Sequence, residues 1–219
     1  MMRVGAPPAV KAMAAAFVVI EAVLTASDLG LLDPLLRFRA YRLFAFFDIY
    51  FEAFLSGQSP PIQFYWSFVT HAFLHGGLLH LAMNTAVFLA LGSHVAHATS
   101  EKSMLALFFG TAAAGALCFG VLGDTGMSFV PMVGASGAIF GFLGCMKRWE
   151  WRYVTAHQLP QRRFWTTILA FAAINVLLSV GLSGGDGGVA WEAHLGGFVA
   201  GWFAGGRLQP RRGFAIGPI

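Results

Sequence analysis

The sequence predicts an all-α, polytopic membrane protein built as one bundle of six transmembrane helices with a long interfacial first loop. Of its 219 residues 57% are hydrophobic and only 11% are charged, and the mean hydropathy is +0.68. Soluble domains carry about 25% charged residues, so this chain lacks the polar surface that a protein needs in water. No linker, internal repeat or low-complexity segment divides it, and we expect a single domain over residues 1–219.

Six stretches approach the roughly 20 apolar residues that a helix needs to cross a bilayer. The predicted spans are residues 9–32, 68–92, 103–123, 129–146, 164–182 and 189–206. The first span is the least clear because it contains Glu21 and Asp28, and the fifth has one polar break, Asn175. The fourth is short and begins in a stretch rich in proline and glycine.

The basic residues predict the orientation, because cytoplasmic loops are enriched in lysine and arginine. With the N-terminus inside, the inner segments hold 11 of the 14 basic residues: Arg3, Lys11, Lys102, Lys147, Arg148, Arg152, Arg162, Arg163, Arg207, Arg211 and Arg212. The outer side keeps Arg37, Arg39 and Arg42. We therefore expect both termini in the cytoplasm, and we read the net charge of +4 as a topology signal that argues against nucleic-acid binding.

The loop over residues 33–63 is too long to be a simple connector. It opens with Asp33-Pro34, which favours a helix start, and continues with aromatic side chains interleaved with arginines. This composition suits helices that lie in the membrane interface and contact lipid. The alternative, a loop packed on the protein itself, is equally compatible with the sequence, and both can hold.

Polar side chains inside a span are costly and mark function by default. In the second span, His71 and His75 stand four residues apart, as do His80 and Asn84, so each pair is predicted to share a helical face. The two pairs point in different directions and are not expected to form one site. His71 and His75 are expected to bond to the first loop.

In the fourth span, Ser136 stands where the helix is expected to start, two residues after Gly134 and directly before Gly137. A serine at a helix start is commonly an N-cap. It can also be a nucleophile, because main-chain N–H groups at a helix start are free to receive an oxyanion. The motif alone favours the N-cap.

The sixth span carries His194 followed by glycines at 197, 201 and 205, a stripe that allows close helix contact. Gly137 and Gly141 form a similar stripe in the fourth span. If the two stripes meet, Ser136 and His194 lie at similar depth near the outer end of one interface. This agreement favours the catalytic interpretation of both residues.

Taken together, these patterns resemble the rhomboid family of intramembrane serine proteases, over residues 60 to about 206. The matching elements are His75-x4-His80-x3-Asn84, Gly134-x-Ser136-Gly137, Ala193-His194-x2-Gly197-x3-Gly201, and Trp66 ahead of Thr70 and His71. Two positions depart from the family pattern. Ser67 stands where arginine is frequent, and Phe140 stands where tyrosine often stacks on the catalytic histidine.

The resemblance implies a serine endopeptidase that cleaves single-span transmembrane substrates near the outer membrane face, in the inner membrane of a bacterium. Ser136 is the expected nucleophile and His194 its base, with no cofactor and no metal. His80, Asn84 and the main-chain N–H of Ser136 are expected to bind the oxyanion. No carboxylate is placed to orient His194, since Glu192 points elsewhere, so stacking on Phe140 is expected to hold the ring. The fifth span is expected to act as a gate and the glycine-rich residues 183–188 as a cap.

Two other functions are compatible with parts of this sequence. The three histidines of the second span could form a metal site, as in a transporter or a metalloprotease. However, no cysteine or carboxylate stands at a helical spacing that would place it beside them. A rhomboid-like protein without activity could instead bind membrane proteins without cutting them, although such a protein would be expected to lack Ser136 or His194. Sequence leaves the natural substrate, the pathway and the oligomeric state open.

Overall fold

The computed structural model describes residues 5–123, 130–181, 189–211 and 213–214. The described elements are helices. In addition, Phe46 and Met132 form one isolated antiparallel β-bridge. In chain order they are α1 (Pro8–Asp28), α2 (Leu36–Phe44), α3 (Asp48–Leu55), α4 (Phe64–Thr70), η1 (His71–Phe73), α5 (Leu78–Ala98), α6 (Glu101–Leu122), α7 (Ser136–Ala156), α8 (Arg162–Gly181) and α9 (Trp191–Arg207). The all-α prediction is confirmed.

Within the described residues, three helices are long and apolar enough to cross a membrane by length and composition: α1, α5 and α6. Helix α7 carries several charges toward its C-terminal end, and α9 has only 17 residues. The six-span arrangement therefore stays a prediction, whereas the character of an integral membrane protein is supported by the three helices.

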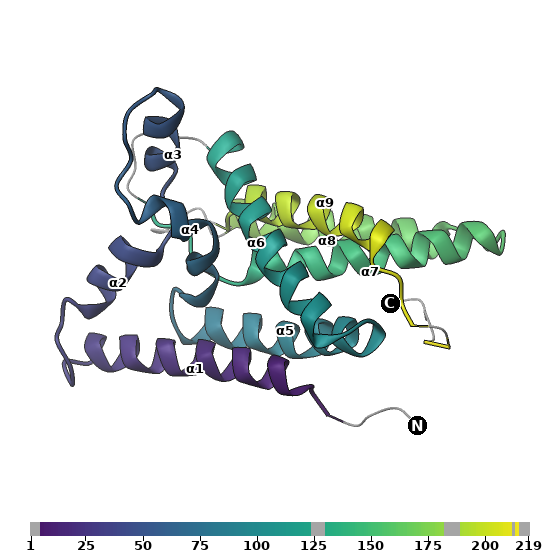
Figure 1. Ribbon diagram of the computed structural model, residues 1–219, viewed down its shortest axis with the longest axis horizontal. Coiled ribbons are helices and arrows are strands. Elements are labelled where there is room, and N and C mark those ends of the chain that lie inside the picture. The colour runs from purple at the N-terminus through teal and green to yellow at the C-terminus, as the bar shows by residue number, and fades with distance from the viewer. Residues whose placement is uncertain (1–4, 124–129, 182–188, 212, 215–219) are drawn as a thin grey trace.

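Two helix pairs flank the centre of the bundle (Figure 1). Helices α1 and α5 lie along one side, α7 and α9 lie side by side on the other, and α6 crosses between them. Where α1, α5 and α6 meet, the rings of Phe17, Phe88 and Phe108 pack edge to face, with Phe17–Phe88 and Phe88–Phe108 centroids 5.2 and 5.6 Å apart. Such aromatic contacts fill the middle of the core without polar atoms.

The α7–α9 interface is built on glycine, as predicted. A Cβ atom added at Gly197 would lie 1.9 Å from the Gly137 carbonyl oxygen, and one at Gly201 would lie 1.9 Å from that of Gly141. Helix α6 reaches α9 in the same way, since a Cβ at Gly115 would lie 2.8 Å from the Ala193 carbonyl oxygen. Helix α9 is therefore held by backbone contact on two sides.

The predicted continuous helix over 68–92 is wrong. The chain forms α4 and η1, turns through an extended Leu74 and a Gly77 with φ of +125°, and begins α5 at Leu78. Only glycine adopts such a φ without strain, so the turn sits where the sequence has two glycines. His71 and His75 consequently do not share a helical face, whereas His80 and Asn84 do.

The fourth predicted helix, 129–146, begins later and ends later than expected, as α7 over Ser136–Ala156. The segment before it is extended, because Met132 exchanges two main-chain hydrogen bonds with Phe46 and Gly134 has a φ of +116°. Beyond the predicted end, Lys147 and Glu150 are buried and form an ion pair, so charged residues continue the helix inside the protein.

Part of the first loop packs on the protein, and its contact with lipid stays a prediction. Phe46, Phe51 and Phe64 are buried in one aromatic cluster, so this part packs on the protein. Helix α2 buries none of its residues and leaves Phe38 59% exposed beside Arg42, which is the pattern of an interfacial helix. At the loop's end the indole of Trp66 donates to the Leu43 carbonyl at 2.7 Å.

Candidate active site

Ser136 occupies the first position of α7. The first hydrogen bond of this helix runs from the Ile139 N–H to the Ala135 carbonyl, so the N–H groups of Ser136 and Gly137 precede the helical ladder. The hydroxyl of Ser136 does not cap the helix. It lies 2.8 Å from Nε2 of His194, so the N-cap interpretation does not apply.

His194 lies in the first turn of α9 and its side chain is only 7% exposed. Its ring stacks on Phe140, with centroids 4.3 Å apart and planes 6° from parallel. The stacking expected from the sequence is therefore present with phenylalanine in place of tyrosine. Because Phe140 is one helical turn after Ser136, α7 supplies both the hydroxyl and the ring face that meet His194.

The other imidazole nitrogen has a partner that the sequence reasoning missed. Nδ1 of His194 lies 2.6 Å from Oδ1 of Asn175 on α8. The ring is therefore oriented by a hydrogen bond as well as by stacking, and the partner is an amide rather than Glu192. Asn175 was visible in the sequence as the one polar break in its span, but nothing in the sequence indicated what it would contact.

His80 and Asn84 lie beside the backbone that leads into Ser136. A Cβ atom at Gly134 would lie 2.8 Å from Nε2 and Cε1 of His80 and 3.9 Å from Nδ2 of Asn84, so only glycine allows this approach. Asn84 is buried and its amide donates to the His80 carbonyl at 3.0 Å. The two side chains expected to bind an oxyanion thus lie close to Gly134, two residues before Ser136.

His75 also approaches this group, contrary to the prediction that the two pairs are separate. Its buried ring lies edge-on to the rings of His80 and Phe17, at 5.4 and 5.5 Å between centroids. The expected bond to the first loop is made by its main chain: Tyr41 and Arg37 donate to the His75 carbonyl. The ring of His71 does not make the expected bond to the first loop: its Nδ1 lies 2.8 Å from the carbonyl of Ser67, which is in α4.

Arg37 joins α2 to α1. Its guanidinium contacts the fully buried carboxylate of Glu21 at 2.8 Å and that of Asp28 at 2.7 Å. Burial opposes the charge on Arg37, but the hydrogen bonds to Glu21, Asp28 and Tyr41 outweigh it and raise the pKa of the guanidinium above its ordinary value. The two carboxylates that made the first span uncertain therefore have a cationic partner from the loop.

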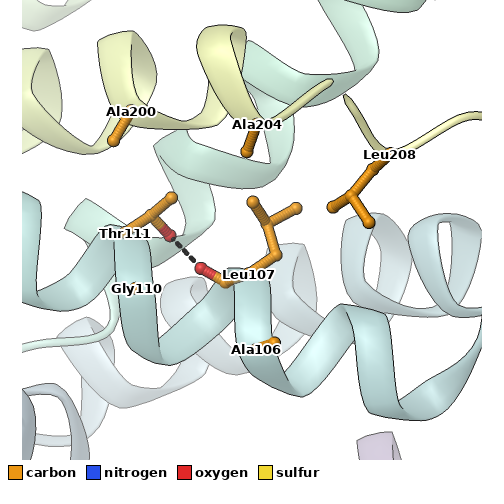
Figure 2. Close-up of a pocket in the computed structure, with 7 residues that line it drawn as sticks. All are labelled: Ala106, Leu107, Gly110, Thr111, Ala200, Ala204 and Leu208. Carbon is orange, nitrogen blue, oxygen red and sulfur yellow. Dashed lines mark hydrogen bonds between the residues drawn. The ribbon is translucent and has the colours of Figure 1, made fainter. Parts of the chain in front are cut away.

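A hollow of about 350 Å³ lies elsewhere, between α6 and α9 (Figure 2). It is lined by Ala106, Leu107, Gly110, Thr111, Ala200, Ala204 and Leu208. Its one hydroxyl, on Thr111, is bonded to the Leu107 carbonyl at 2.7 Å. The other residues that line this hollow are apolar or glycine, and its hydroxyl is already hydrogen-bonded, so the lining presents no reactive side chain. The arrangement around Ser136 therefore remains the candidate site. Within the described ranges, no three histidine, cysteine or acidic side chains are grouped to hold a metal ion.

The chain is similar to known proteins over most of its length. Residues 63–211 match the rhomboid domain family. The chain is 28% identical over 153 residues to rhomboid protease GluP of Bacillus subtilis, covering 70% of this chain and 28% of that protein. It is 32% identical over 152 residues to RHOMBOID-like protein 5 of Arabidopsis thaliana, covering 68% of this chain and 46% of that protein.

A third relative, the uncharacterized protein ML1171 of Mycobacterium leprae, is 34% identical over 139 residues, which cover 58% of this chain and 50% of that protein. The chain thus spans half or less of the length of these three relatives. The family match covers both the residues around Ser136 and those around His194. The chain belongs to the rhomboid family.

Proposed function

We propose that this protein is an intramembrane serine endopeptidase in which Ser136 is the nucleophile and His194 the general base. One observation carries the proposal: the His194 imidazole lies between the Ser136 hydroxyl at 2.8 Å and the Asn175 amide oxygen at 2.6 Å. An amide oxygen can only accept a hydrogen bond. Nδ1 of His194 therefore carries a proton and donates a hydrogen bond to Asn175. Nε2 of the neutral ring is then the acceptor that a general base needs.

In the proposed reaction the Ser136 oxygen attacks a scissile carbonyl while its proton moves to Nε2 of His194. The imidazolium then protonates the leaving amine as the C–N bond breaks, and an acyl-enzyme forms on Ser136. Water releases the acyl group by the same steps in reverse order, with His194 again taking and returning a proton. Asn175 and Phe140 hold the ring in the same orientation throughout.

The negative oxygen of each tetrahedral intermediate is proposed to lie among the main-chain N–H of Ser136 and the side chains of His80 and Asn84. The close approach of His80 and Asn84 to Gly134, two residues before Ser136, supports this location. Preorganised donors of this kind contribute strongly, and removal of one typically lowers the rate by about 10²–10³-fold.

The proposed substrates are single-span membrane proteins, cut near the outer face of a bacterial inner membrane, with both termini of the enzyme in the cytoplasm. The distribution of lysine and arginine supports this orientation. Ser136 and His194 each lie in the first turn of their helices, and the predicted orientation assigns both helix starts to the outer side. The expected cap, residues 183–188, lies outside the described residues, and gating by α8 stays a prediction.

The test is cleavage of a panel of single-span substrates in detergent by the wild type, Ser136→Ala and His194→Ala. Because nucleophile and base act as a unit, each substitution is expected to lower cleavage by at least about 10⁴-fold. A fluorophosphonate probe is expected to label the wild type and not Ser136→Ala. The matched controls are Ser93→Ala and His157→Ala, which change the same residue types away from the site.

Cleavage by Ser136→Ala at the wild-type rate would rule out the proposed nucleophile. A wild type that binds the substrates but neither cuts them nor reacts with the probe would favour the alternative, a rhomboid-like binding protein without activity.

A further inference from the structure

One peptide group connects the first loop to His80. The carbonyl of His75 accepts from the Tyr41 hydroxyl at 2.8 Å and from Nη1 of Arg37 at 3.1 Å. The N–H of the same peptide group, on Gly76, donates to Nδ1 of His80 at 3.2 Å. A single planar amide thus lies between α2 and a residue proposed to bind the oxyanion.

The hydrogen bond from Gly76 decides which nitrogen of His80 carries the proton. In a neutral imidazole one nitrogen accepts and the other donates, so a ring that accepts at Nδ1 has its proton on Nε2. The Nε2 edge is the one that faces Gly134, two residues before Ser136. His80 is therefore presented to the site as a donor.

The groups on the carbonyl side strengthen this arrangement. Hydrogen bonds in series polarise one another, so donors on the His75 carbonyl make the Gly76 N–H a better donor. One of those donors is a guanidinium that Glu21 and Asp28 hold in place. Arg37 and Tyr41 are four residues apart on α2, so both reach the carbonyl from one helical face.

We propose that Arg37 and Tyr41 are positioning residues of the oxyanion site, acting through the His75–Gly76 peptide group to keep His80 in its Nε2–H form. The proposal rests on the proposed protease function and extends it to the interfacial helix. If the contacts of Arg37 and Tyr41 served only to attach α2 to the bundle, their loss would lower stability. The effect of that loss would then be the same with and without the His80 side chain.

Tyr41→Phe removes one donor and keeps the ring, and Tyr65→Phe is its matched control because Tyr65 is 57% exposed on α4. We expect Tyr41→Phe to lower kcat about two- to tenfold, the range of one hydrogen bond, with KM nearly unchanged. Tyr65→Phe is expected to change neither constant. Arg37→Lys, which keeps the charge, is compared with Arg39→Lys, whose guanidinium contacts Asp33 at the surface.

The decisive comparison repeats Tyr41→Phe in a His80→Ala background. Residues coupled through one network are not additive, so no further fall in kcat is expected once His80 is absent. An equal fall in both backgrounds would overturn the proposal. In a Ser136→Ala background, ¹⁵N NMR of labelled histidine measures the His80 tautomer without any activity. There we expect the Nε2–H form in the parent and its partial loss with Tyr41→Phe.

The two proposals fail in different ways. Wild-type cleavage by Ser136→Ala would overturn the protease function, whereas the NMR comparison would still test the coupling of α2 to His80. A dead Ser136→Ala with an unchanged kcat and an unchanged His80 tautomer in Tyr41→Phe would overturn only the role of Arg37 and Tyr41.

Discussion

Helices α9 and α8 each bring one residue to the candidate site, but they are held in opposite ways. Helix α9 carries His194 and packs through glycine against the backbones of α6 and α7, at distances that exclude any side chain. Helix α8 carries Asn175, has no glycine before Gly181, and leaves Leu169, Ile174 and Leu177 more than half exposed.

The difference in packing indicates different roles for the two helices: α9 fixes the position of His194, and α8 supplies its hydrogen-bond partner. In the proposed mechanism His194 must keep its distance to Ser136, and close backbone packing preserves that distance because it leaves no room for movement. The residue that orients the imidazole lies on a helix with fewer close contacts, so its hydrogen bond can adapt. Loss of packing at α9 should therefore affect the whole protein, and changes at Asn175 should affect mainly the reaction.

The largest expected effect tests the packing of α9. Gly201→Ala places a methyl group 1.9 Å from the Gly141 carbonyl oxygen, whereas Gly110→Ala on α6 meets nothing within 4 Å. Overpacking of this kind costs about 1–3 kcal/mol or more, so Gly201→Ala should lower the melting temperature in detergent and abolish cleavage. Gly110→Ala should be neutral or slightly stabilising. Equal melting temperatures for the two variants would contradict the close contact.

The next effect isolates the hydrogen bond from α8. Asn175→Ala should lower kcat about tenfold, since the imidazole loses the acceptor that selects its tautomer, and should lower the melting temperature less than Gly201→Ala does. Asn175→Asp keeps an acceptor at the same place and should recover most of the rate. The neighbouring Ile174→Ala is the control, because Ile174 is 51% exposed. A fall in kcat for Ile174→Ala equal to that for Asn175→Ala would assign the effect to α8 packing.

The smallest effect concerns the ring that stacks on His194. Phe140→Tyr keeps the stacking face and should change kcat/KM less than about twofold. Phe140→Ala removes a contact of about 0.5–1.5 kcal/mol and should lower kcat/KM about two- to tenfold. Cleavage assays on one substrate measure both. A large loss in Phe140→Tyr would show that the site depends on the ring's apolar edge and not only on its face.

How far the sequence predicts this protein differs between its parts. Ser136 and His194 could be paired because glycines at fixed spacing follow each of them, and such repeats report which helix faces meet. By contrast, the prediction of one continuous helix over residues 68–92, made from an apolar stretch of spanning length, is wrong. No formally charged residue interrupts that stretch, and its mean hydropathy does not reveal that Gly76 and Gly77 interrupt the helix.

The sequence by itself determined that this is an all-α membrane protein and that Ser136 and His194 meet, because composition and helical periodicity are properties of local segments. Only the tertiary structure decided that Asn175 orients His194 and that α2 reaches His80 through the His75–Gly76 peptide group. These contacts join helices whose spacing in the sequence carries no information about one another. A polar residue within a span shows that it needs a partner, but the fold decides which one it meets.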